Sequence, residues 1–141
     1  MTRLQILAER YGTDRSIGVR WDESSGLSLL PDGGAASNCY NCADFIRERE
    51  PFTAIFGFFS DNNPGWAGAA LLDGHDFAVV EGRYIVDPWI VETARLAERA
   101  VFDTENEDDA AEISRIYGRS DRWVLVDPSS KDRRCPRDSW R

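Results

Sequence analysis

The residues best suited to chemistry in this chain are Cys39 and Cys42, three positions apart, and His75, the single histidine of the sequence. A nucleophilic cysteine must lose its proton, and a helix N-terminus or a neighbouring imidazolium favours the thiolate. A carboxylate that holds the imidazole in one tautomer completes such a site. His75 begins one apolar stretch, and Asp87 ends the next one along the chain. These residue types predict a catalytic triad of Cys39, His75 and Asp87.

The stretch 39–50 predicts a helix that begins at the cysteines. Asn38 is a favourable N-cap, and Pro51 prevents the helix from continuing. If the helix begins at Cys39, both cysteines share an apolar face with the alanine and isoleucine that follow. This favours Cys39 as the nucleophile and Cys42 as a small buried residue one turn below. A helix that begins at Cys42, with Cys42 as the nucleophile, is the alternative and has a less regular apolar face.

The sequence around His75 and Asp87 predicts a β-hairpin, "HDFAVV" and "RYIVD" flanking "EG". Opposed residues of an antiparallel pair share a face of the sheet. A two-residue loop would put His75 and Asp87 on opposite faces. A loop of residues 80–82, with Gly82 in the left-handed conformation, would place them directly opposite each other. The triad requires this second register or an equivalent bulge.

A Cys-x-x-Cys pattern is also typical of zinc sites and redox pairs. Cys39, Cys42, Cys135 and His75 could supply the four ligands of structural zinc. However, Cys135 lies in a tail that we predict to be irregular, and Asp87 is a better-placed partner for His75. A thioredoxin-like pair would need a βαβ setting, which the chain does not indicate. We therefore expect no metal and no organic cofactor.

The segments "NCYNCADFIRERE" and "GHDFAVVEGRYIVDPW" resemble the papain-fold toxin family, the protein-glutamine deamidase-like group of the papain-like cysteine hydrolase superfamily. The matching positions are Asn38, Cys39, Cys42, Gly74, His75, Phe77, Val79, Val80, Asp87 and Pro88. They fall within residues 37–89, roughly a third of the chain. The resemblance implies an α+β fold with a papain-like core, in which a nucleophile-bearing helix packs on a small antiparallel sheet. It also implies attack of the thiol on a glutamine side chain.

Two further residues are candidates for contacting the substrate. The segment before Cys39 has no glutamine placed like the oxyanion-hole residue of papain-type proteases, so the backbone N–H of the nucleophile would need a second donor. Asn38 is the candidate for that donor. Trp66 precedes His75 in a predicted loop and is a candidate wall of the substrate groove, with ordinary packing as the alternative. Asp76 is expected to face solvent.

The flanking sequence predicts further elements. We expect helices over 2–11 and up to residue 118, the latter opening with the acidic stretch 103–112. An apolar, aromatic strand is predicted over 52–59 and a late strand over 123–127. The stretch 89–102 is expected to be helical in its later part.

Composition and charge argue against two classes, nucleic-acid-binding and membrane-spanning proteins. The chain has 141 residues and a net charge of −8, which disfavours nucleic acid as a partner. It has no apolar run of the roughly 18 residues that a membrane span needs, and its N-terminus is no secretory signal peptide. We expect a single papain-like domain over 1–141, with the catalytic core at 36–90 and an irregular basic tail at 128–141. The expected location is the cytoplasm, or delivery by a specialised secretion system.

The sequence therefore predicts a cysteine amidohydrolase that deamidates a glutamine side chain of a target protein through a thioester, as a bacterial toxin or effector would. A papain-like cysteine protease or an acyltransferase of the transglutaminase kind would use the same residues. The non-enzymatic alternative is a binding or inhibitory module with structural cysteines. The expected partners are a protein substrate and, for a toxin, an immunity or inhibitor protein.

Overall fold

A computed structural model describes residues 1–62 and 74–128, and it begins with a helix and a small hairpin. Helix α1 (Arg3–Tyr11) starts with a capping box, in which Thr2 and Gln5 exchange hydrogen bonds between side chain and backbone. The antiparallel strands β1 (Arg20–Asp22) and β2 (Leu27–Leu29) follow. The helix agrees with the predicted range 2–11.

The centre of the fold is a five-stranded sheet with the strand order β6-β5-β4-β3-β7, in which every neighbouring pair is antiparallel. The strands are β3 (Thr53–Phe59), β4 (Gly74–Val80), β5 (Tyr84–Val86), β6 (Val101–Asp103) and β7 (Val124–Val126). Strand β4 is central and all seven of its residues are buried. A residue on β4 is therefore held by neighbouring strands and by the layers on both faces.

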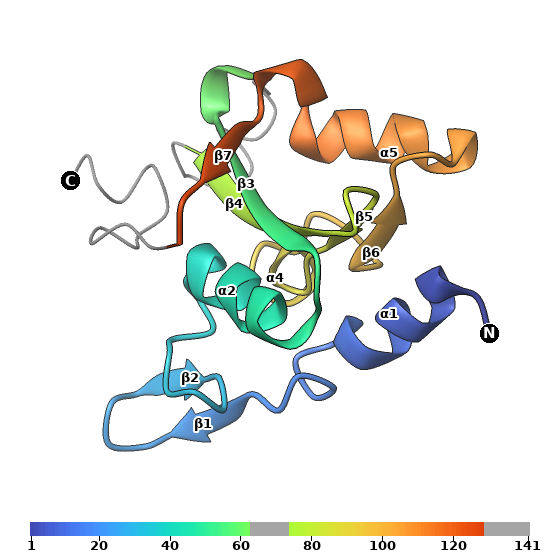
Figure 1. Ribbon diagram of the computed structural model, residues 1–141. Helices are drawn as coiled ribbons and strands as arrows, with labels where there is room; N and C mark the ends of the chain where they lie inside the picture. Colours follow the sequence, from blue (N-terminus) through green and yellow to red (C-terminus); the bar gives the residue numbers. More distant parts are fainter. Residues whose placement is uncertain (63–73, 129–141) are drawn as a thin grey trace.

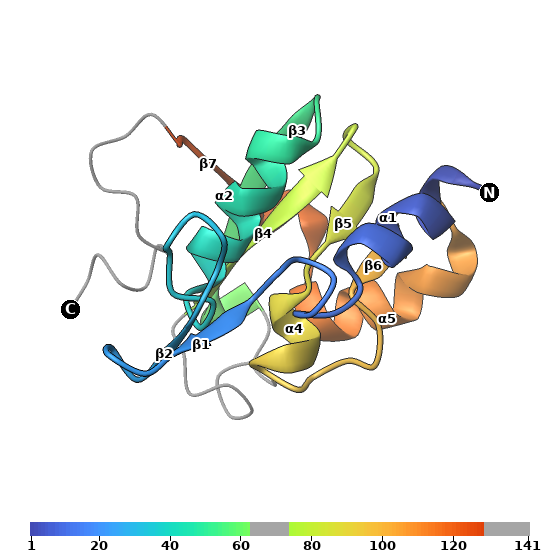
Figure 2. The same ribbon diagram turned by 90° about the horizontal axis from the view of Figure 1, so that it is seen from below.

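Helices cover both faces of this sheet. The remaining elements are α2 (Cys39–Arg49), α4 (Trp89–Glu92) and α5 (Glu107–Tyr117), with short 3-10 turns η1 (Ser60–Asn62) and η2 (Ser120–Arg122). Helices α1 and α2 lie on one side of the sheet and α5 lies on the other (Figures 1 and 2). The protein is thus a mixed α+β fold, in which the cysteine-bearing helix packs against β3 and β4.

Local sequence explains where the two long helices after the hairpin begin and end. In α2, the Asn38 side chain accepts hydrogen bonds from the backbone N–H groups of Tyr40 and Asn41. The helix ends at Arg49, with Glu50 as its C-cap, so it stops before Pro51 as predicted. In α5, Asn106 caps the start, where three acidic residues favour the helix dipole. Gly118, with φ of 67°, ends it at the predicted residue.

The stretch 89–102 was predicted to be helical in its later part, and this was wrong, because its helix lies at the start. Only Trp89–Glu92 is helical, and Val101–Asp103 is strand β6 at the edge of the sheet. Arg95 has a φ of 55°, which no α-helix accommodates. The backbone between these elements turns instead, with the Leu96 N–H bonded to the Ile90 carbonyl. Pairing with β5 outweighed the helical propensity of the alanines and leucine in this stretch.

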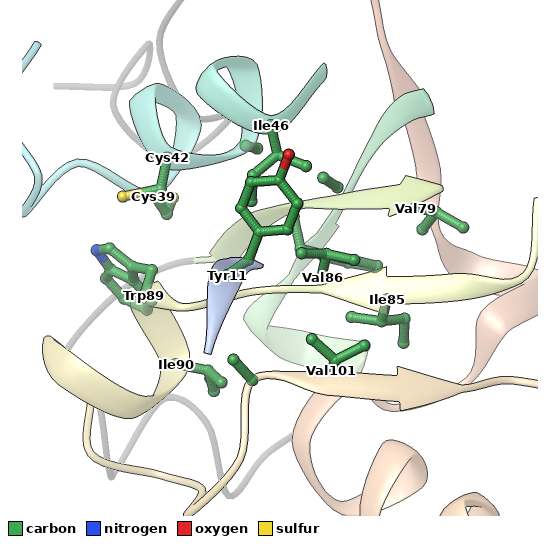
Figure 3. Packing of buried hydrophobic residues seen from close by; sticks show 14 of the residues in the cluster. Tyr11, Cys39, Cys42, Ile46, Val79, Ile85, Val86, Trp89, Ile90 and Val101 are labelled. Carbon is green, nitrogen blue, oxygen red and sulfur yellow. The ribbon is translucent and has the colours of Figure 1, made fainter. Parts of the chain in front are cut away.

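The buried side chains of the described residues form one hydrophobic cluster, part of which is shown in Figure 3. Helix α1 contributes Leu7 and Tyr11 to this core, and it also contacts Glu50, a buried carboxylate at the end of α2. Glu50 accepts a hydrogen bond from Tyr11 and forms ion pairs with Arg3 and Arg10. Burial raises the pKa of Glu50, but the hydrogen bonds from Tyr11 and Arg3 outweigh it and leave that pKa lowered.

Within the described ranges, no helix combines the length and the apolar character that crossing a bilayer requires.

Candidate active site

His75 and Asp87 are in direct contact inside the protein. The distance between His75 Nε2 and Asp87 Oδ2 is 2.7 Å, and the two residues are 0% and 3% exposed. A carboxylate can only accept, so Nε2 is the nitrogen that donates in this pair. The neutral ring then carries its basic lone pair on Nδ1. The pair therefore has the arrangement that a base and its orienting carboxylate need.

The strands bring this pair together in a register other than the predicted one. Val80 pairs with Tyr84, so the loop consists of residues 81–83 and not 80–82. Continued along β5, this register places Asp87 across from Phe77, which is two residues from His75. The predicted direct opposition was wrong, but residues two apart share a face, and a diagonal pair is within reach. Gly82 has φ of 64°, the predicted left-handed conformation.

Tyr117 is a third member of this buried group, and the sequence did not indicate it. Its hydroxyl donates to Asp87 Oδ2 at 2.8 Å, the same oxygen that His75 contacts. Burial and the nearby Asp87 carboxylate raise the pKa of the Tyr117 hydroxyl well above its usual range, so it stays a donor. Tyr117 is the last residue of α5, and α5 therefore helps to fix the orientation of the carboxylate.

Aromatic rings hold the imidazole in place. The Trp89 ring stacks on His75 with centroids 4.7 Å apart and an interplanar angle of 25°. Phe77 stacks on the same imidazole at 5.9 Å, and Phe58 meets it edge-on at 6.0 Å. The Trp89 indole N–H is in turn bonded to the Ser37 carbonyl at 2.8 Å. The residues before α2 and after β5 are thus joined at the position of His75.

Cys39 is the first residue of α2, and its thiol approaches the strand that carries His75. Its Sγ is 3.4 Å from the backbone nitrogen of Asp76, the residue directly after His75. The N-terminal end of a helix carries partial positive charge, which favours a thiolate there. Asn38 holds that end through its side-chain oxygen, as predicted for an N-cap. In Figure 3, Cys39, Cys42 and Trp89 gather at the same end of the core.

The two cysteines differ in state. Cys39 is disulfide-bonded and 1% exposed, whereas Cys42 is a free thiol and 3% exposed. The Cys42 thiol donates to the Ala36 carbonyl at 3.2 Å. Burial and the nearby carboxylates Asp87 and Asp32 raise the pKa of Cys42 far above its usual value. Cys42 is thus held as a neutral thiol, whereas Cys39 would be a nucleophile only after its disulfide is reduced.

Gly74 is required by the close packing at the start of β4. A Cβ atom at this position would clash with the Phe58 carbonyl oxygen on the neighbouring strand β3. The adjacent pair on these strands is His75 with Phe58. The glycine in the "GHDF" motif therefore lets β3 approach at the residue that sets the position of the imidazole.

Other predictions about the site have mixed outcomes. Asp76 was expected to face solvent, but it is 0% exposed, because β4 is the central strand with layers on both faces. Trp66 and Cys135 lie outside the described residues, as does the tail from residue 129. In the part of the chain that is described, no group of three or more His, Cys, Asp or Glu side chains could hold a metal ion.

Comparison of the chain with models of known protein families gave no match, and searches of curated proteins and of solved structures gave none either. The papain-fold resemblance therefore stays a prediction that depends on the quoted motifs.

Proposed function

We propose that this protein is a cysteine amidohydrolase that deamidates a glutamine side chain of a protein, with Cys39, His75 and Asp87 as its triad and a papain-like arrangement of its core. The observation that carries the proposal is the buried contact between His75 Nε2 and Asp87 Oδ2, with Cys39 Sγ beside the next backbone nitrogen. Thiol catalysis needs these groups together, a nucleophile at a helix start and an imidazole oriented by a carboxylate.

The reaction would proceed in two halves. The Cys39 thiolate attacks the carboxamide carbon, and imidazolium His75 protonates the departing ammonia, which leaves a thioester. Water then attacks the thioester while His75 accepts its proton, and the products are a carboxylate and the regenerated thiol. Asp87 holds the imidazole through Nε2 during both halves. The backbone N–H of Cys39, with a second donor for which Asn38 is the candidate, would stabilise the oxyanion.

Mass analysis tests this proposal. The reduced protein is incubated with candidate target proteins, and each target gains about 1 Da when a carboxamide becomes a carboxylate through the thioester route. Fragments would indicate the protease alternative, and an adduct would indicate acyl transfer to an amine. Cys39→Ala should abolish the change while Cys42→Ala keeps it. Loss of activity in Cys42→Ala with activity retained in Cys39→Ala would contradict the assignment of the nucleophile.

The burial of the site favours one second candidate, a binding or inhibitory module with structural cysteines. Cys39 and His75 are 1% and 0% exposed, and Cys39 is disulfide-bonded. A disulfide that only stabilises the fold would fit these observations. The two candidates differ in the reactivity of Cys39 after reduction. A catalytic Cys39 depends on His75 for its reactivity, whereas a structural cysteine reacts as an ordinary thiol whether or not His75 is present. Ordinary, slow alkylation of Cys39 would favour the module.

A further inference from the structure

A cavity of about 430 Å³ lies next to the proposed triad without reaching it. Ala36, Ser37 and Cys42 form one wall, so the cavity runs along the residues on either side of Cys39. Pro88 and Trp89, which follow β5, also line it. Cys39 itself does not line the cavity.

The Trp89 indole lies between this cavity and the imidazole. Trp89 lines the cavity and also stacks on His75, with ring centroids 4.7 Å apart. Since His75 is fully buried, a ligand in the cavity meets the indole before it meets the imidazole. The indole is held by a hydrogen bond to the Ser37 carbonyl. Rotation of this side chain would break that bond and remove the ring that stacks on His75.

We propose that this cavity is the substrate-binding site and that Trp89 separates it from Cys39 and His75 until a substrate displaces the ring. The inference rests on the proposed function, because it assigns the cavity to the substrate of that reaction. The volume suits one or two side chains of a protein, within the range of small-molecule sites. The cavity therefore receives the target carboxamide together with its neighbouring residue.

The lining specifies the chemistry of that substrate. Ile17, Val19 and Leu27 supply apolar surface to the lining. Among the described residues of the lining, Asp14 and Glu92 contribute carboxylates and Arg95 contributes a guanidinium. This balance favours an apolar or basic residue next to the carboxamide and disfavours an acidic one. The occupant is thus an uncharged or basic protein segment.

Alkylation of Cys39 in the reduced full-length protein tests the route, with iodoacetamide as a small carboxamide probe and mass mapping to locate the label. Leu27 lines the cavity and is 44% exposed, so Leu27→Trp fills the space with little effect on folding. It should slow alkylation of Cys39 at least about fivefold by blocking access. Leu125→Trp is the matched control, because Leu125 is 65% exposed and does not line this cavity. Equal rates in the two variants would overturn the proposal.

Charge selectivity gives a second readout. Glu92→Lys should raise the rate with anionic iodoacetate relative to iodoacetamide by about two- to fourfold, since it reverses one charge at the cavity. Glu98→Lys is the control, because Glu98 is exposed and does not line this cavity. An unchanged ratio in Glu92→Lys would overturn the charge assignment.

Alkylation of Cys39 can be measured without any turnover of a substrate. The alkylation rates therefore test the cavity, and the mass change of a target protein tests the amidohydrolase activity. Slowing by Leu27→Trp in a protein that modifies no target would support the cavity and contradict the amidohydrolase. Turnover that Leu27→Trp leaves unchanged would support the amidohydrolase and overturn the cavity as its substrate site.

Discussion

Tyr117→Phe removes the hydroxyl that donates to Asp87 and changes little else, because the ring stays in the core. The lost bond is 2.8 Å long and ends on a carboxylate that is 3% exposed. A hydrogen bond to a charged group contributes about 1.5–3 kcal/mol, and the buried acceptor cannot recover it from water. We expect the free energy of unfolding to fall by about 2 kcal/mol. For a chain of this size the Tm should then fall by roughly 6–10 °C.

The assay is thermal and urea unfolding, compared with Tyr84→Phe. Tyr84 is also a buried tyrosine, on β5, but no side-chain hydrogen bond from its hydroxyl is found among the described residues. The control should stay within about 0.5 kcal/mol of the wild type. If the proposed activity is present, Tyr117→Phe should also lower kcat more than it raises KM, because Asp87 positions His75 and does not touch substrate. Equal stability of the two variants would refute the assigned role of the Tyr117 hydroxyl.

Three further predictions follow from other parts of the structure. Glu50→Gln should lower the free energy of unfolding by about 1–3 kcal/mol at neutral pH. Because folding lowers the pKa of Glu50, its contribution to the free energy of unfolding is present above its unfolded pKa and is lost as the pH falls through its folded pKa. Urea unfolding should therefore show the difference between the variant and the wild type disappearing in acid. A difference that is independent of pH would contradict this. Gly74→Ala should cost about 1–3 kcal/mol through the clash with Phe58, measured by the same method, and a neutral result would contradict the close approach. Activity should appear only after a reducing agent opens the Cys39 disulfide; equal activity of the oxidised protein would exclude Cys39 as the nucleophile.

The parts of the site that the sequence predicted well depend on local patterns. Asn38 next to Cys39 is an N-cap signal, and the helix does begin there. His75 and Asp87 are close because one hairpin carries both, and even with a different loop they share a face. The loop position itself could not be predicted, since residues 80–82 and 81–83 are both compatible with a left-handed Gly82.

The parts that the sequence missed depend on contacts between distant segments. Tyr117 lies on the apolar face of α5, so a buried hydroxyl that needs a partner was foreseeable, but nothing in the sequence pointed to Asp87. The burial of Asp76 follows from the central position of β4, which is set by the order of all five strands. The strand at 101–103 formed because β5 offered an edge, which overrides local propensity.

The most direct test of the proposed triad is the rate at which Cys39 of the reduced protein reacts with iodoacetamide between pH 5 and 9 (about the range over which imidazole and thiol groups titrate). The triad predicts a rate that stays near its maximum below neutral pH, where the rate of an ordinary thiol falls, and it predicts that His75→Ala and His75→Gln restore the ordinary pH profile while remaining folded. A wild-type Cys39 that reacts only as the pH rises above about 8, like an ordinary thiol, would contradict the triad.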